Sequence, residues 1–482
     1  MSNSTSRVRL FAAAALLIAV ALTACAVGPN YRRPATALAP QFHAAETAAY
    51  SSEEAQAHFW KVFNDATLDQ LVDAALDANH DLRIALGRLA EARAARHQSL
   101  YDLAPTLTAQ AGHQTQLVPQ VQTGFPFRTS YYEAGFDASW ELDLFGRVRR
   151  EVEASNASLE AAEANLRDAQ VSVTAEVART YFELRGVQDQ LAVARRNVEN
   201  EQETFDYTNA RLEAGRSTDL DTSRARAQLS STLASIDPLL AAESRAIHRL
   251  SVLTGREPDA LEVTLHAPAE IPALPEITAV GDPSALLRRR PDIRIAERQL
   301  AATTAQVGVA VGDLFPKVTF NGSFGYDAAT LNGLGAGSGR SYVIGPSISW
   351  AFLNLGRVHA QVAAAHARND TALAQYEKTV LGALEETENS LVTHARTHDQ
   401  LVHAADAAQA SAQAAKLARV RYEGGLVDFL EVLDAERTQL QAENQLAQTR
   451  TDDATSLVAV YKTLGGGWVD DPLPRYTRAA SR

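Results

Sequence analysis

Two stretches of the chain alternate between apolar and polar residues, and each runs into a long helical pattern. From Tyr132 to Leu142 the even positions are apolar, and from Glu133 to Asp143 the odd positions are small or polar. Residues 341–352 repeat this alternation. Successive side chains of a strand point to opposite faces, so each strand would have an aromatic face and a polar face. The pattern suits a membrane β-barrel strand, and equally a half-buried strand of an ordinary antiparallel sheet.

Each of these strands is preceded by a second alternating stretch. Pro105 opens the first of these stretches and Pro316 opens the second. The stretch Gly333-x-Gly335-x-Gly337 resembles a nucleotide-binding loop only weakly, because no helix follows it, and it is predicted to be an external loop. The sequence therefore predicts two β-hairpins, at residues 105–143 and 316–353.

Long helices are predicted next to both hairpins. No proline occurs from Gly146 to about Arg211, and a helix of that length reaches about 100 Å. Five apolar positions within it have the 3, 4, 3, 4 spacing of a coiled-coil seam: Leu159, Ala162, Leu166, Ala169 and Val173. Shorter helices are predicted at 67–101 and 217–254, and Pro238 is expected to divide or kink the second of them.

The pattern then recurs about 210 residues further along the chain. Asp292–Ala296 corresponds to Asp81–Ala85, and Gly356-Arg357 corresponds to Gly146-Arg147. Two tandem repeats are therefore predicted. The predicted segments are a first repeat at 67–255, a connector at 256–283, a second repeat at 284–467 and a C-terminal tail at 468–482.

The N-terminus has the features of an export signal. Arg7 and Arg9 precede a short apolar core, and Leu22-Thr23-Ala24-Cys25 resembles a bacterial lipoprotein cleavage box. Residues 1–24 would then be removed, and Cys25 would become the lipidated first residue. Cys25 is the only cysteine, so no intramolecular disulfide can form. Residues 25–66 are predicted to be an extended segment lying on the surface.

Composition excludes several classes of function. The formal net charge of −13 argues against nucleic-acid binding. No nucleophile elbow, phosphate loop or paired-carboxylate cleft is evident, so we do not expect the chain to be an enzyme. His394 and His398 have metal-ligand spacing on a helix, but we interpret them as histidines of a solvated face. Met1 is the only methionine, which leaves a soft-metal relay without support. No cofactor is expected beyond the covalent lipid.

Four strands per chain constrain the assembly. Four strands cannot close a barrel, and an open sheet edge is not tolerated in lipid. Eight strands from a dimer would leave almost no lumen, whereas twelve from a trimer would leave one. The expected fold is a mixed α+β membrane protein, a homotrimeric 12-stranded β-barrel continued by a long α-helical coiled-coil barrel.

Several segments together resemble the TolC-type outer-membrane factor family, in its lipoprotein branch that serves multidrug efflux. The resemblance covers essentially all of the mature chain. It rests on Cys25–Pro34, on Trp60-x-x-Phe63-x-Asp65-x-x-Leu68, on Arg289–Ile293 and on Leu464–Trp468. It implies a passive exit duct that is lipid-anchored in the bacterial outer membrane and extends into the periplasm. The implied partners are a periplasmic adaptor and an inner-membrane pump, which we expect to be proton-driven.

Two alternatives to the efflux duct are open. The same fold could serve as the exit duct of a type I (ABC) protein secretion system. A periplasmic coiled-coil scaffold without a pore is a third hypothesis, against which the paired alternating strands argue.

The resemblance also implies functional positions at the two helix-hairpin tips, which form the periplasmic mouth in the family. Arg211, Gly215, Arg421 and Gly425 would contact the adaptor. Glu431 and Asp434 match a segment that places carboxylate rings in the mouth. The alternative is that both are ordinary acids near a helix N-terminus, where the positive end of the helix dipole favours them.

Other tip residues would hold the mouth closed. Tyr422 and Asp221 match a pair that ties the mouth in some relatives. Val427 stands where those relatives have an arginine. The closed mouth would therefore be held more weakly, or by hydrophobic contacts from Leu426 and Phe429. Leu426 or Val427 would narrow the bore.

The lipid-facing candidates share one face of the predicted strands. They are Tyr132, Phe136, Trp140, Phe320, Phe324, Tyr342, Ile348 and Trp350.

Overall fold

A computed structural model describes residues 26–36, 39–46, 50–51, 53, 56–118, 125–275 and 278–468. Cys25 and the predicted signal sequence therefore lie outside the described residues. The chain divides into two compact units. Unit one comprises Met1–Ala35, Arg88–Glu163 and Ile295–Lys378, and unit two comprises Thr36–Gly87, Ala164–Arg294 and Thr379–Arg482, each as far as it is described.

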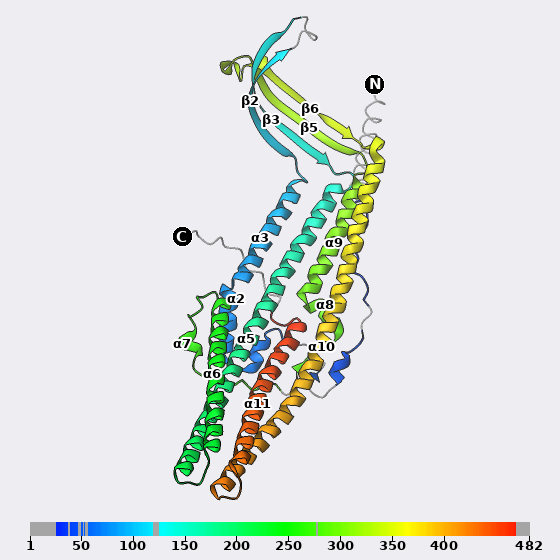
Figure 1. Cartoon of the computed structure of the whole chain (residues 1–482). Coiled ribbons are helices and arrows are strands. Elements are labelled where there is room, and N and C mark those ends of the chain that lie inside the picture. The colour runs from blue at the N-terminus through cyan, green and yellow to red at the C-terminus, as the bar shows by residue number, and fades with distance from the viewer. Residues whose placement is uncertain are drawn as a thin grey trace. The chain divides into compact units, whose positions relative to one another are not determined.

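Unit one contains a four-stranded antiparallel sheet in the order β2-β3-β5-β6 (Figure 1). The strands are β2 (Thr106–Val118), β3 (Phe127–Leu142), β5 (Lys317–Ala328) and β6 (Arg340–Ser349). β2 and β3 form one hairpin and β5 and β6 form the other. β3 pairs with β5 and so joins the two hairpins into one sheet. β2 and β6 are the two edges of the sheet. The glycine-rich stretch 333–337 lies between β5 and β6.

The register places the predicted aromatic residues on one face. Phe136 is opposite Phe324, which is in turn opposite Tyr342, and Trp140 is opposite Phe320. Directly opposed residues of neighbouring strands share a face. These aromatic side chains are exposed in the single chain, with Tyr342 at 69%. Tyr132 is half-buried, and its ring packs against His113.

At the end of the sheet nearest the helices, two tryptophan side chains form hydrogen bonds with the segments that precede the hairpins. The Trp140 indole donates a hydrogen bond to the Leu103 carbonyl at 3.0 Å, and the Trp350 indole donates one to the Leu314 carbonyl at 3.0 Å. Trp350 follows the last residue of β6, so the strand is shorter than the alternation suggests. Both indoles satisfy a carbonyl just before a hairpin begins.

The helices recur in the same order around both hairpins. The first set is α2 (Ala66–Ala78), α3 (His80–Tyr101), α5 (Arg147–Glu213) and α6 (Asp219–Leu253). The second set is α8 (Pro283–Arg289), α9 (Pro291–Gly312), α10 (Leu355–Glu423) and α11 (Phe429–Thr463). The connector also contains α7 (Glu262–Leu265). Among the described residues, no helix is both long and apolar enough to cross a membrane.

One expectation about the helices is wrong, and another is wrong in part. The helix expected at 67–101 is interrupted at Asn79, whose amide oxygen accepts from the Asp81 and Leu82 backbone N–H groups and caps α3. The Asn79 amide nitrogen donates to the Leu253 carbonyl at 2.9 Å. Pro238 does not divide the helix in which it lies, because α6 continues through it.

The core of unit two corrects the expectation that residues 25–66 lie on the surface. Phe59, Trp60 and Phe63 lie in the 3-10 helix η2 (Phe59–Phe63) and are almost fully buried. The Phe59 ring stacks on Tyr461 from α11, with 5.3 Å between ring centroids. Burial of aromatic surface stabilises this docking.

A second part of the N-terminal segment pairs with the connector. The two-residue strand β1 (Tyr50–Ser51) runs parallel to β4 (Thr278–Ala279). Phe42, just before the 3-10 helix η1 (His43–Glu46), is buried in a cluster with Leu391 and Leu464. The segment is thus part of the core of unit two.

Candidate functional site

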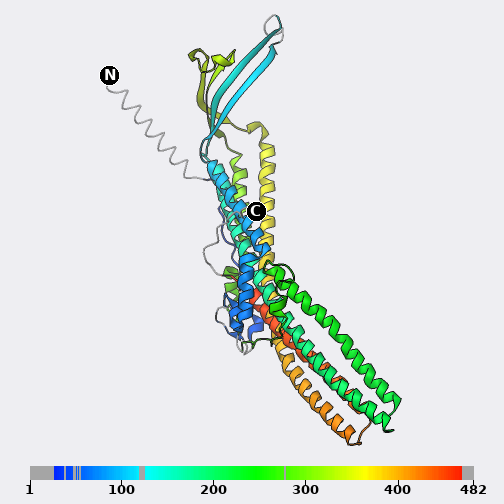
Figure 2. The same cartoon turned by 90° about the vertical axis from the view of Figure 1, so that its left-hand side faces the viewer.

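The two helix hairpins of unit two end in matching turns (Figure 2). Gly215 (φ 65°) and Gly425 (φ 72°) adopt the left-handed conformation just after α5 and α10. In both turns the next residue donates back to a carbonyl five residues earlier, Arg216 to Arg211 and Leu426 to Arg421. This is the Schellman ending of a helix, which requires glycine at the left-handed position. Gly215 and Gly425, which the sequence analysis placed at the helix-hairpin tips, thus lie in these turns.

Arg211 joins the two turns. Its guanidinium lies 4.6 Å from the centroid of the Tyr422 ring and 5.8 Å from that of Tyr207. Its Nη1 atom also donates to the Tyr422 carbonyl at 3.1 Å. A cation over two aromatic faces with a carbonyl acceptor is a stabilising arrangement. Arg211, expected to contact an adaptor, therefore links α5 to α10 within the chain, whereas Gly215, Arg421 and Gly425 are exposed.

The expected pair of Tyr422 and Asp221 is not joined within the chain. The Asp221 carboxylate accepts hydrogen bonds from the Thr218 N–H and hydroxyl and from the Ser217 hydroxyl, forming a capping box at the start of α6. Tyr422 is buried in a tip cluster with Ala225, Phe429 and Val432. Phe429 thus packs inside the hairpin pair.

Leu426 and Val427 have different surroundings. Leu426 is 74% exposed, whereas Val427 is half-buried and packs on the tip cluster. A side chain that narrows a bore must project away from its own hairpin. Leu426 meets this requirement and Val427 contributes to packing.

Glu431 and Asp434 are exposed near the start of α11. Asp428 caps this helix, since its carboxylate accepts from the Leu430 and Glu431 backbone N–H groups. Neither the Glu431 nor the Asp434 side chain forms an ion pair within the described part of the chain. Both carboxylates are therefore available to an ion or another chain.

A buried polar layer behind the tips was not found from the sequence. Glu436 of α11 accepts from Arg419 of α10 and from Thr204 of α5, each at 2.8 Å. Glu201 of α5 accepts from Gln228 of α6 at 3.0 Å, and burial, with a smaller contribution from Glu436, raises the pKa of Glu201. These contacts link all four helices. In the sequence, the only sign of this buried layer is a glutamate at a helix position that is otherwise apolar.

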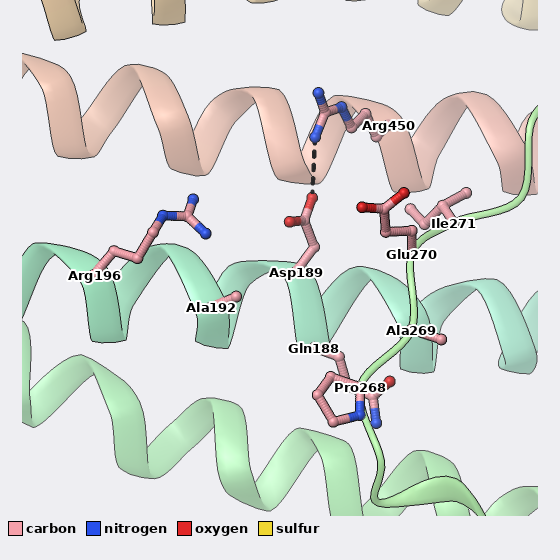
Figure 3. A pocket seen from close by; sticks show the side chains of 9 residues that line it. All are labelled: Gln188, Asp189, Ala192, Arg196, Pro268, Ala269, Glu270, Ile271 and Arg450. Atoms are coloured by element: carbon pink, nitrogen blue, oxygen red, sulfur yellow. Dashed lines mark hydrogen bonds and ion pairs between the residues drawn. The ribbon is translucent and has the colours of Figure 1, made fainter.

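A polar cavity of about 430 Å³ lies between α5, α11 and the connector in unit two (Figure 3). Asp189 and Arg450 approach within 3.5 Å of each other at its centre. The lining residues are Gln188, Asp189, Ala192, Arg196, Pro268, Ala269, Glu270, Ile271 and Arg450. This cavity was not predicted from the sequence, because its walls are far apart along the chain.

His394 does not belong to a solvated face, contrary to expectation. It is buried and lies 3.4 Å from the carboxylate of Asp453 of α11, which is 1% exposed, while His398 lies 3.3 Å from the other carboxylate oxygen. Burial lowers the pKa of His394, and the Asp453 charge only partly opposes this effect. Among the described residues, no group of three or more His, Cys, Asp or Glu side chains is placed to bind a metal ion.

The buried His394 predicts a pH dependence of stability. Because its pKa in the folded state lies below the value of about 6.5 in an unfolded chain, the folded state binds fewer protons, and acidification below about pH 6.5 should destabilise the fold. His394→Gln should weaken the dependence of the thermal midpoint on pH between about 7.5 and 5. His403→Gln, at an exposed position of the same helix, is the control. Identical pH profiles for wild type and His394→Gln would contradict the prediction.

A four-stranded antiparallel sheet with one aromatic face, attached to paired helices with matching turns, defines the class of TolC-like outer-membrane channels. The structure of the outer-membrane channel OprN superimposes with a TM-score of 0.87 at 44% identity, covering 92% of this chain and 100% of that chain. The open state of the MtrE channel of Neisseria gonorrhoeae gives 0.80 at 29% identity, covering 92% and 98%.

The chain belongs to the outer membrane efflux protein family, whose model matches residues 71–256 and again 283–466. It is 34% identical to outer membrane protein OprJ of Pseudomonas aeruginosa, over 95% of this chain and 96% of the relative. It is 31% identical to the solvent efflux pump outer membrane protein SrpC of Pseudomonas putida, over 93% and 96%. The protein is thus an outer-membrane efflux channel and not an enzyme.

Proposed function

We propose that the chain forms a homotrimer that acts as the passive exit duct of a tripartite efflux system. Three sheets build a 12-stranded barrel, and the helices of two tandem repeats of about 210 residues continue it as a coiled-coil barrel in the periplasm. A lipid on Cys25 anchors the N-terminus. Drugs or other small toxic compounds enter from a proton-driven inner-membrane pump and a periplasmic adaptor.

The observation that carries this proposal is the sheet with two open edges and two dissimilar faces. The aromatic face suits lipid, and the polar face suits a water-filled lumen. The edge strands β2 and β6 leave backbone groups that lipid cannot satisfy, so each edge requires a strand from another copy. Three copies give a barrel with a lumen, whereas two would give one filled by side chains.

The names of the relatives support the choice of cargo. SrpC and the toluene efflux protein TtgI of Pseudomonas putida, both 31% identical, are described as parts of solvent and toluene efflux pumps. We therefore favour small apolar toxic compounds over secreted proteins as the cargo of this chain.

At the periplasmic mouth, we assign Glu431 and Asp434 to threefold carboxylate rings that favour cations. Threefold repetition of exposed acids in a narrow passage creates a cation-selective field. Leu426 is the residue that narrows the bore, because its side chain projects from the turn without packing on its own hairpin. Gly215, Arg421 and Gly425 lie in the surface that meets the adaptor.

Leu426→Ala is expected to increase the leak conductance of the purified channel severalfold and to leave its thermal midpoint unchanged. The side chain is exposed, so its removal opens the passage without disturbing the tip cluster. Val427→Ala is the matched comparison and should lower the stability of the tip, since Val427 packs on that cluster. The measurement is single-channel conductance in planar bilayers. An unchanged conductance in Leu426→Ala would contradict this role.

The proposed function is tested by crosslinking in cells. Cysteine is introduced singly at Ser217 and at Arg421, one at each hairpin tip, and captured proteins are identified by mass spectrometry. Capture of an adaptor that belongs to a proton-driven resistance pump supports the efflux duct. Capture of the adaptor of an ABC exporter would instead indicate that the duct serves protein secretion. Absence of any adaptor, together with absence of a heat-resistant trimer, would reject the duct.

A further inference from the structure

The two faces of the sheet differ in the sign of their charges. Over the four strands, the register puts every acidic side chain on the polar face: Glu133, Asp137, Glu141 and Asp327. Lys317 shares that face and pairs with Asp313. The aromatic face has no acid in these strands, and its charged residues are Arg128 of β3 and Arg340 of β6.

Both arginines lie at one end of the aromatic face. Arg340 is ten positions from Trp350, and Arg128 is twelve positions from Trp140. At about 3.3 Å per residue these separations are about 33 and 40 Å along the strands. Strands tilted by about 40° would then place the arginines about 25–30 Å above the tryptophans, close to the height of an outer-membrane apolar band.

The opposite end of the same face is uncharged. Leu142, Val318 and Ile348 occupy it, and all three are apolar. The two ends of the aromatic face therefore differ, with tryptophan and aliphatic residues next to the helices and guanidinium groups at the far end. Such an asymmetry suits two membrane surfaces of different chemistry.

The environment of the arginines leaves their guanidinium groups available. Both residues are exposed, and neither side chain forms a hydrogen bond or an ion pair within the described part of the chain. A guanidinium presents paired N–H donors that fit a phosphate in bidentate geometry. At the edge of an apolar band, an anionic headgroup is the partner that compensates this charge.

We propose that Arg128 and Arg340 bind phosphate groups of lipids in the outer leaflet of the outer membrane. The inference rests on the proposed function, in which the aromatic face of the sheet meets lipid. The two sites lie on different hairpins, so a trimer would present six guanidinium groups to the surrounding lipid. They would hold the barrel at a fixed depth and retain phosphorylated lipid around it.

The test uses the purified full-length protein in detergent and native mass spectrometry with bis-phosphorylated lipid A as the probe. The double variant Arg128→Gln/Arg340→Gln should lose lipid A binding, with a loss of roughly tenfold for each arginine, as expected for a charge-assisted hydrogen bond. Lys317→Gln, which removes one positive charge from the polar face, should bind like wild type. Arg128→Lys/Arg340→Lys should bind at an intermediate level, because the charge remains but the paired donors are lost.

Two results would overturn the assignment. One is equal lipid A binding by wild type and the double glutamine variant, and the other is equal wild-type binding of dephosphorylated lipid A. Conductance of the same preparations reports on the duct separately. A conducting wild type with arginine-independent binding rejects the lipid site alone, whereas arginine-dependent binding without conductance rejects the duct alone.

Discussion

Gly186→Ala is expected to destabilise the protein by about 2 kcal/mol or more, although alanine is the better helix former. Gly186 lies inside α5, where α11 passes close to it. A Cβ atom there would be 1.9 Å from the Thr451 hydroxyl oxygen and 2.8 Å from the Thr451 Cβ. The Thr451 Cβ is not the flexible end of a side chain, so the two helices would have to separate.

Gly87→Ala provides the matched control for this experiment. Gly87 lies inside α3, and a Cβ atom there would meet nothing within 4 Å. The same substitution should therefore stabilise the protein at this position by about 0.5–1 kcal/mol, through helix propensity and a more restricted unfolded chain. The thermal midpoint of the helical circular dichroism signal measures both variants. A change of the same sign in both would refute the close approach of α5 and α11.

Arg290→Met is expected to cost about 3 kcal/mol of stability, at the lower end of the range for breaking a buried ion pair because Glu386 is partly exposed. Arg290 pairs with Asp292 at 2.7 Å and with Glu386 at 2.8 Å, and it donates to the Thr463 carbonyl at 3.0 Å. Burial and then the charge of Asp292 raise the pKa of Asp168, and Arg290 opposes this effect. If Arg290 is removed, this cation no longer offsets the repulsion between the neighbouring carboxylates.

The loss caused by Arg290→Met should depend on pH in a defined direction. The folded-state pKa of Asp168 is raised, and removal of Arg290 should raise it further, so the difference from wild type should shrink as the pH falls and Asp168 becomes protonated. Arg294→Met, at an exposed position of α9, is the control and should change stability by less than about 0.5 kcal/mol. Equal effects of the two substitutions at neutral pH would show that Arg290 is not a buried partner.

The parts of the fold that could be predicted are those whose sequence signal lies within a few neighbouring residues. Alternation with a period of two located the strands and the aromatic face that contains Phe136 and Phe324, because a strand assigns faces residue by residue. The turns at Gly215 and Gly425 were predictable for a similar reason, since a left-handed residue after a long helix requires glycine. The exposure of Glu431 and Asp434 agrees with their place on the polar side of α11.

The features that were missed depend on partners distant in sequence. His394 was interpreted as a residue of a solvated face, but it is buried and lies beside Asp453 of another helix. Arg211 and Tyr422 are 211 residues apart, so neither residue predicts their contact. Trp60 lies in a proline-bearing segment that resembles a surface strap. It is buried in a cluster that also contains residues of α5, α6 and α11, and the local sequence pattern contains no information about these distant partners.

The docking of η2 against α11 affects the order in which the protein can fold. Phe59 and Tyr461 stack in one core although they are about 400 residues apart along the chain. When a chain is exported from its N-terminus, Phe59 lacks its partner Tyr461 until α11 has crossed the inner membrane. Contacts of such large sequence separation form slowly and leave apolar surface uncovered in the interval. The protein should therefore depend on periplasmic chaperones, and a truncation within α11 should leave the first aromatic segment to aggregate.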